Sequence, residues 1–398
     1  MGISDMANGE TASGGMTTVA SRIPSICAMI GGHGAPGSIA ALSARRVAAV
    51  SAMIDEVAQG RKRKTTRKRR MGNYRCYEEV CTLGGGTFGN VFKVRHRATG
   101  QAVVAVKALR CEAGSDSKHV VGELLREACI MAACGGHPSL MALRGVVRTP
   151  RDAKGRRDYF LVMEFAGPSL RQVLSKRIRL GRRLFSERDV RSIVRQLLAG
   201  AEVMHTHGIM HRDIKPENIL VVQNGGSIVV KIGDYGAALV EKGSSYWAAG
   251  TWVYSAPEML LEDPRYDTRV DLWSIGCVMA ELLTGNKLFP GDGIDELLYK
   301  IFDLLGTLGE RERESGPAFS SPGHEVQAQQ WRAHQRLRKL FPEKLLSKEG
   351  FQVLQGLLTS NPSRRLDAAA ALRLPWFTDT GAMPVAAVPE TGAPRPQL

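Results

Sequence analysis

The pattern of apolar and polar positions changes twice along the 398 residues. From about residue 74, apolar and polar residues alternate and glycines interrupt them, as in YEEVCTLGGGTFGNVFKVRHRATGQAVVAVKAL. A period of two is typical of half-buried strands, so this segment predicts three antiparallel strands. A helical pattern follows from about Val120 to Cys134, and further strand-like sequence runs from Met141 to Phe165.

After Ser186 the period becomes that of a helix, with Ser186 itself as a suitable N-cap. One helical face then collects the apolar side chains of Val190, Ile193, Val194, Leu197, Leu198 and Ala201. Most of the sequence from there to about Phe377 is helical in pattern, apart from the strand-like VVKIG at 229–233. We therefore expect an α+β fold with two lobes, a small antiparallel β-rich lobe over about 74–165 and a larger, mainly helical lobe over about 166–377.

The two ends of the chain differ in composition from this central part. Residues 1–36 are rich in Gly, Ser, Thr and Ala and have almost no aromatic side chains. Such a segment buries too little surface to offset the entropy of ordering, so we expect the extension 1–73 to be disordered. The Ala-rich stretch 38–58 is compatible with one helix. The Pro- and Ala-rich tail 378–398 is expected to be flexible.

The charge is strongly positive and unevenly placed. Lys and Arg total 54 against 39 Asp and Glu, a net charge of +15, and eight of the ten residues in 61–70 (RKRKTTRKRR) are basic. This run favours nuclear import over a cytoplasmic location, with a solvated tether as the alternative. Nucleic-acid binding is disfavoured because no aromatic side chain interleaves the run. A plastid transit peptide also stays open, since no acidic residue lies between Glu10 and Asp55.

Two simple counts bear on the class of protein. No run of about 18 apolar residues exists, so we expect no membrane span. The seven cysteines form no CxxC pair, which favours reduced thiols over a disulfide framework or a zinc site.

A glycine-rich segment lies between the first two expected strands. It fits L-G-x-G-x-F-G-x-V with Leu83, Gly84, Gly85, Gly86, Thr87, Phe88, Gly89, Asn90 and Val91. Glycines let a backbone approach phosphate oxygens closely, and the position between two strands argues against a dinucleotide-binding loop. Lys107 follows on the next strand, where it can pair with phosphates. Glu127, in the helical stretch after it, can hold the Lys107 ammonium group.

A second set of motifs carries candidate chemistry. His211 to Asn218 match H-R-D-x-K-P-x-N without substitution. Asp213 can accept a proton from an attacking hydroxyl, Lys215 can offset charge on a transferred phosphoryl group, and Asn218 can bind Mg²⁺. Asp234 opens a D-F-G variant with Tyr235 in place of Phe, and its carboxylate is a second candidate metal ligand.

These ordered motifs resemble those of eukaryotic protein kinases over residues 77–377. The resemblance implies a bilobal fold, ATP in the cleft, Mg²⁺ as metal, and transfer to Ser or Thr hydroxyls of protein substrates. It also implies Met163 as gatekeeper and Glu164, Phe165 and Ala166 as the hinge, with Glu164 and Ala166 binding the nucleotide. It further implies that Arg365 pairs with Glu258 and that a buried Asp271 anchors the catalytic loop.

Within that family, the segments LFPGD (288–292), IDEL (294–297) and NPSRRLDAAAALRLPWF (361–377) resemble cyclin-dependent kinases, nearest to the plant F type. A regulatory cyclin-like subunit is therefore a candidate partner. However, the expected PSTAIRE-like helix reads GELLREA at 122–128, which argues against an ordinary cyclin.

Two features of the resemblance leave regulation and substrate choice open. The activating Thr of the family aligns with Tyr246, beside Ser244 and Ser245. The family also has three arginines that bind the phosphate on that Thr. Only Arg126 and Arg212 match them, because Leu239 stands in the place of the third. Ser255 replaces an arginine that supports selection of proline after the target residue, so proline preference stays undecided.

Two main functional alternatives remain at this point. One is an active kinase, and the other is a pseudokinase or scaffold that binds nucleotide and partner proteins without turnover. The residues that handle phosphate and metal distinguish them, and all six are present: Lys107, Glu127, Asp213, Lys215, Asn218 and Asp234. The sequence therefore favours an active Ser/Thr kinase.

Overall fold

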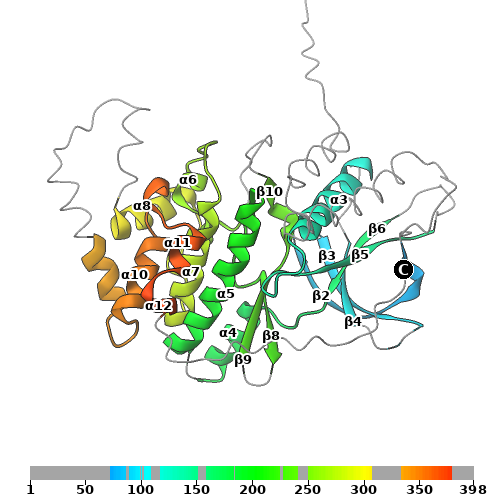
Figure 1. Cartoon of the computed structure of the whole chain (residues 1–398), viewed down its shortest axis with the longest axis horizontal. Helices are drawn as coiled ribbons and strands as arrows, with labels where there is room; N and C mark the ends of the chain where they lie inside the picture. Colours follow the sequence, from blue (N-terminus) through cyan, green and yellow to red (C-terminus); the bar gives the residue numbers. More distant parts are fainter. Residues whose placement is uncertain are drawn as a thin grey trace, which may run out of the picture.

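The structure is a computed structural model that describes residues 72–86, 89–98, 100, 103–108, 117–150, 158–182, 184–224, 227–240, 250–306 and 333–378. Within these ranges the chain forms two lobes, with the strands of one and the helices of the other lying side by side (Figure 1). The predicted α+β bilobal architecture is confirmed. The basic run 61–70, the stretch 38–58 and nearly all of the tail 378–398 lie outside the described residues.

The N-terminal lobe is built on one six-stranded sheet. Its order is β1-β5-β6-β4-β3-β2, and every neighbouring pair is antiparallel except β1, which is parallel to β5. The strands are β1 (Gly72–Asn73), β2 (Tyr77–Gly86), β3 (Gly89–His96), β4 (Val103–Ala108), β5 (Leu143–Arg148) and β6 (Tyr159–Glu164). The three antiparallel strands predicted from the alternating pattern are confirmed as β2 to β4. The sheet starts two residues before the predicted boundary at 74, because β1 adds to its edge.

Helix α3 (Ser117–Ala133) covers this sheet, as predicted from the change of period near Val120 (Figure 1). Its apolar face is buried against β5 and β6 through side chains that include Leu124, Ala128 and Met131. The packing places Glu127, on the same helix, beside β4.

The C-terminal lobe is organised around α5 and α7. Ser186 caps α5 in a capping box with Asp189, in which each side chain accepts a hydrogen bond from the other residue's backbone N–H. All six side chains of the predicted apolar face are buried. The helices of this lobe are α4 (Leu170–Arg179), α5 (Glu187–Thr206), α6 (Pro257–Leu260), α7 (Arg269–Thr284), α8 (Ile294–Leu305), α10 (Lys348–Leu357), α11 (Ala368–Leu372) and α12 (Pro375–Thr378).

Helix α7 lies at the centre of this lobe and is buried on all sides from Val270 to Leu283. Gly276 allows the close packing, since a Cβ there would lie 2.9 Å from a methyl group of Leu358. No described helix is both long and apolar enough to cross a membrane.

Four short strands lie between the lobes and fix the segments that carry the motifs. They are β7 (Ile209–Met210), β8 (Ile219–Asn224), β9 (Ser227–Ile232) and β10 (Leu239–Val240). β8 pairs with β9, and β7 pairs with β10. Residues 211–218 therefore connect β7 to β8, and residues 233–238 connect β9 to β10, so the pairing brings the two motif segments together. Only β9 had been expected from the sequence.

Candidate active site

The glycine-rich segment forms the turn of the β2–β3 hairpin, as predicted. Gly84 pairs with Val91, and Gly85 pairs with Asn90. A Cβ on Gly85 would lie 2.6 Å from the Asn90 side-chain oxygen, and Gly89 has φ +124°, so both positions favour glycine. Thr87 and Phe88, at the tip, lie outside the described residues.

Lys107 lies under this hairpin, on β4, where it pairs with Val91 of β3 and Leu161 of β6. Its Nζ atom is 2.9 Å and 3.0 Å from the two carboxylate oxygens of Glu127. The same Nζ is 2.6 Å from Oδ1 of Asp234. The predicted pairing of Lys107 with Glu127 is therefore confirmed, and the third group comes from a segment 127 residues further along the chain.

The three charges are unbalanced, because one ammonium group faces two carboxylates. Burial alone would lower the pKa of Lys107, but the charges of Glu127 and Asp234 outweigh burial and raise it. Burial raises the pKa of Glu127, although Lys107 opposes this. Burial would also raise the pKa of Asp234, but Lys107 lowers it below its usual value. Asp234 is thus the carboxylate that stays ionised most readily.

Asp234 sits in a left-handed backbone conformation, with φ 59°, at the start of the 3₁₀ turn Tyr235–Ala237. The Tyr235 ring that replaces phenylalanine is fully buried and lies 5.4 Å from the His211 ring. Its hydroxyl donates to the Ile232 carbonyl, 3.3 Å away. The extra oxygen of the D-Y-G variant therefore has a partner, and the tyrosine is accommodated without an unsatisfied buried group.

Asp213 is held from several directions. Lys215 Nζ lies 2.8 Å from its Oδ2, and Asn218 Nδ2 donates to Oδ2 and to the Asp213 carbonyl, each at 2.9 Å. Thr251 Oγ1 donates to Oδ1 at 3.0 Å and accepts from Lys215 at 2.6 Å. The structure brings together the predicted Asp213, Lys215 and Asn218, and it adds Thr251, whose bridging position the motif spacing did not indicate.

Asp271 anchors this loop from α7, as the resemblance implied. Its oxygens accept from the backbone N–H groups of His211, at 2.9 Å, and Arg212, at 2.8 Å. His205 Nε2 lies 2.9 Å from Oδ2. Burial alone would raise the pKa of Asp271, but these hydrogen bonds with His205 and His211 lower it. Gly250 closes the loop from the other side, since a Cβ there would lie 2.3 Å from the Arg212 carbonyl oxygen.

The two arginines expected to bind an activating phosphate hold main-chain carbonyls at the end of the D-Y-G motif and in the two residues after it. Arg126 donates to the carbonyls of Ala238, at 2.8 Å, and Gly236, at 3.3 Å. Arg212 donates to Ala237, at 2.8 Å. These bonds join α3 and the catalytic loop to one segment. The candidate phosphorylation positions lie outside the described residues: Ser244, Ser245 and Tyr246.

The expected hinge begins at the last residue of β6. Met163 is buried, and the Glu164 carboxylate accepts from the Ala142 N–H at 2.8 Å and lies 3.0 Å from Lys231 Nζ. Lys93 Nζ lies 4.6 Å from the centre of the Phe165 ring. Because the Glu164 side chain is already engaged, any contact of Glu164 and Ala166 with a nucleotide would come from their main chain.

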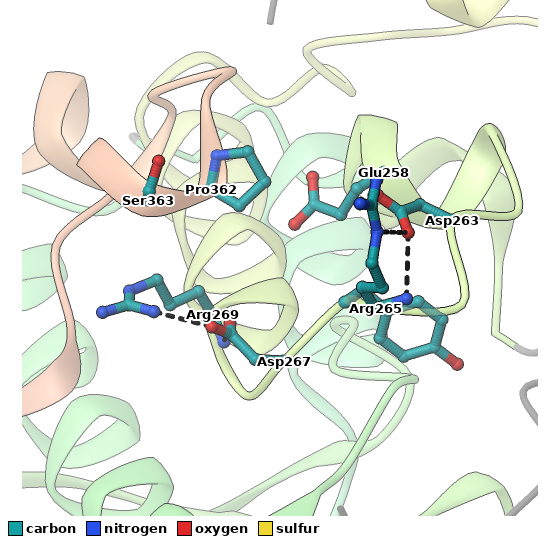
Figure 2. A pocket seen from close by; sticks show the side chains of 8 residues that line it. Glu258, Asp263, Arg265, Asp267, Arg269, Pro362 and Ser363 are labelled. Carbon is teal, nitrogen blue, oxygen red and sulfur yellow. Dashed lines mark hydrogen bonds and ion pairs between the residues drawn. The ribbon is translucent and has the colours of Figure 1, made fainter. Parts of the chain in front are cut away.

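The predicted Arg365–Glu258 pair is also confirmed, with two contacts of 2.6 Å and 2.9 Å. Glu258 lines a small polar pocket together with Asp263, Arg265 and other residues (Figure 2). Arg265 bonds to Asp263 there. The pocket contains none of the residues predicted to bind nucleotide or metal, so it is separate from the candidate active site.

The donor set fits Mg²⁺. The Asn218 amide nitrogen is engaged by Asp213, which leaves the amide oxygen as the atom that can coordinate. The Asp234 side chain is 36% exposed, so its carboxylate is reachable from the cleft. Hard oxygen ligands of this kind, one or two side chains together with phosphate oxygens, are typical of Mg²⁺ sites in phosphoryl-transfer enzymes.

Comparisons with known proteins agree with this geometry. Residues 77–377 match the model of the protein kinase domain. The chain is 41% identical over 325 residues to "Putative cyclin-dependent kinase F-2" of Oryza sativa subsp. japonica, which covers 80% of this chain and 95% of the relative. It is 35% identical over 314 residues to "Cyclin-dependent kinase G1" of Arabidopsis thaliana, covering 76% of this chain and 48% of the relative.

A third relative shows a similar level of identity. "Cell division control protein 2 homolog 3" of Trypanosoma brucei brucei is 34% identical over 307 residues, covering 76% of this chain and 92% of the relative. The motifs, their geometry and these matches lead to one conclusion: the chain belongs to the protein kinase family and is a Ser/Thr kinase of the cyclin-dependent kinase type.

Proposed function

We propose that this kinase transfers the γ-phosphoryl group of ATP with Asp213 as the residue that orients the substrate hydroxyl and accepts its proton. The observation that carries the assignment is the convergence of Lys215, Asn218 and Thr251 on the Asp213 carboxylate. A carboxylate held by three partners presents its oxygen atoms in one geometry, and catalysis of phosphoryl transfer depends mainly on such positioning.

Lys107 and the hairpin above it would hold the phosphates. Glu127 keeps the ammonium group of Lys107 in place through two contacts, so its position does not depend on the nucleotide. The glycines of the hairpin let backbone N–H groups approach phosphate oxygens closely. The main chain of Glu164 and Ala166 would contact the base, since the Glu164 side chain is engaged elsewhere.

Asn218 and Asp234 would hold Mg²⁺, which when bound neutralises negative charge on the phosphate oxygens. Lys107 donates a hydrogen bond to the Asp234 carboxylate and so fixes the orientation of that carboxylate toward the cleft. Lys215 lies beside Asp213, where its positive charge can offset charge on the phosphoryl group during transfer.

Location in the nucleus and control by a regulatory subunit are part of the proposal. The basic run 61–70 supports import into the nucleus. A cyclin-like regulatory subunit is a proposed partner by analogy with the relatives, although GELLREA at 122–128 argues against an ordinary cyclin. The pseudokinase alternative has no support, because none of the six residues that handle phosphate and metal is missing.

The test compares purified full-length protein with its Asp213→Asn variant, using Mg²⁺-ATP and a degenerate Ser/Thr peptide library. We expect the variant to bind ATP nearly as well as the parent while turnover falls by a factor on the order of hundreds or more. Full turnover in the variant would refute the role of Asp213. ATP binding without turnover in the parent would indicate that a regulatory subunit or a phosphate is missing.

A further inference from the structure

A second cluster of charges lies beside the catalytic loop and is not used by the mechanism above. Arg171, at the start of α4, donates through Nε to Glu217 and through Nη1 to Glu281, each at 2.7 Å. Its Nη2 donates to the Tyr254 hydroxyl at 2.6 Å. That hydroxyl donates in turn to the second oxygen of Glu281, at 2.7 Å. One guanidinium group therefore joins three separate segments of the chain.

The cluster is an acidic site filled by an internal arginine. Two carboxylates face one guanidinium group, so a negative charge would be exposed if Arg171 were removed. The Glu281 side chain is 1% exposed, whereas those of Arg171 and Glu217 are 25% and 44% exposed. Burial alone would lower the pKa of Arg171, but its hydrogen bonds to Glu281 and Glu217 raise it. The site is thus reachable from solvent on the Glu217 side.

The cluster around Arg171 lies close to the residue proposed to orient the substrate hydroxyl. Glu217 lies in the same loop as Asp213, four residues further on, and the Arg171 N–H donates to the carbonyl of Pro216 at 2.9 Å. Tyr254 lies three residues after Thr251, which bonds to Asp213. A peptide whose hydroxyl reaches Asp213 must therefore place its neighbouring residues close to these two segments.

We propose that Arg171 is a specificity-determining residue, which occupies the acidic site of Glu217 and Glu281 and thereby prevents the kinase from selecting Arg or Lys near the phospho-acceptor. The inference rests on the proposed role of Asp213. A substrate guanidinium group would need the same carboxylate oxygens, and Arg171 occupies them without the loss of translational freedom that a substrate side chain would incur. Removal of Arg171 should convert the filled site into a binding site for a basic side chain.

The test is a peptide-library assay of the full chain and its Arg171→Ala variant, followed by matched peptides that differ by one Arg or Ala at the selected position. The parent should show no enrichment of basic residues. The variant should prefer the Arg peptide by about tenfold or more in kcat/KM, the scale expected of one charge-assisted hydrogen bond. Adding Glu217→Gln should abolish that gain. Arg179→Ala, an exposed arginine on the same helix, is the control for net charge.

Removal of Arg171 leaves Glu281 buried without its cation, and the variant could fail to fold for that reason. The double variant Arg171→Met/Glu281→Gln avoids the unpaired charge and keeps Glu217, so a smaller gain that depends on Glu217 is expected. A folded and active variant with the parent's preferences would overturn the proposal, and so would a parent that already selects Arg through Glu217. A parent inactive on every peptide would instead count against the proposed function.

Discussion

Two groups of ionised side chains, one inside the C-terminal lobe and one in the cleft, differ in how completely their charges are matched. In the C-terminal lobe Arg365 faces Glu258 one to one, with side chains 0% and 4% exposed. The guanidinium group also donates to the carbonyls of Thr359, Arg269 and Ser360. In the cleft, Lys107 faces both Glu127 and Asp234, and Asp234 is 36% exposed.

This difference separates a structural pair from a functional group of charges. A buried ion pair is tolerated when each charge and each N–H group has a partner, which is the case for Arg365. The charges around Lys107 carry an excess negative charge that opens toward the cleft, where a cation can bind. An unbalanced, partly exposed set of charges is therefore the better indicator of chemistry than burial or short distance alone.

The largest expected effect on stability comes from disrupting the Arg365–Glu258 ion pair. Arg365→Met should lower the free energy of unfolding by about 3–5 kcal/mol, because Glu258 would remain buried without a counter-charge. Urea unfolding followed by circular dichroism measures the change. The double variant Arg365→Met/Glu258→Gln should be more stable than the single one, since no unpaired charge remains. Equal losses in the two variants would show that packing, and not charge, is what the pair contributes.

Loss of a carboxylate from the group around Lys107 should affect turnover much more than the free energy of unfolding. Asp234→Asn should reduce turnover by a factor on the order of a hundred or more, because an amide is a weaker Mg²⁺ ligand than a carboxylate. The same change should alter the free energy of unfolding by only about 1 kcal/mol or less, as for other partly exposed pairs.

Steady-state assays over a range of Mg²⁺ concentrations, together with urea unfolding, measure both effects. Asp263→Asn, which removes a carboxylate paired with Arg265 outside the active site, is the matched control and should leave turnover unchanged. A strongly destabilised but fully active Asp234→Asn protein would contradict the distinction between the two groups.

The sequence predicted the parts of this molecule that local patterns encode. Alternation gave β2 to β4, the helical period gave the buried face of α5, and Ser186 was correctly expected as its cap. The pairing of Lys107 with Glu127 could be expected because both lie in motifs with a known order. The two-residue strands β1, β7 and β10 could not, since a period of two needs more residues to be recognised.

The contacts that complete the site could not be predicted from the sequence either, but for a different reason. Thr251 bonds to Asp213 across 38 positions, and Arg171 bonds to Glu281 across 110. Nothing in the local pattern around these residues distinguishes them from solvated polar side chains. Their partners are defined only when α4, α7 and the catalytic loop have packed together.

The smallest expected effect is a difference in pH dependence between the two carboxylates beside Lys107. The pKa of Asp234 is lowered in the folded protein, so its contribution to stability is present above the unfolded pKa, near 3.8, and is lost as the pH falls through the folded value. The pKa of Glu127 is raised, so its contribution is present below the unfolded value, near 4.5, and is lost as the pH rises through the folded value.

Urea unfolding of the parent, Glu127→Gln and Asp234→Asn between about pH 3 and pH 7 would measure both slopes. The stability of the parent relative to Asp234→Asn should increase as the pH rises from 3, whereas its stability relative to Glu127→Gln should decrease as the pH rises above 4.5. The signs oppose each other because burial dominates at Glu127 and the charge of Lys107 dominates at Asp234. Slopes of the same sign would mean that Lys107 neutralises both carboxylates alike, and the excess negative charge in the cleft would then not be localised on Asp234.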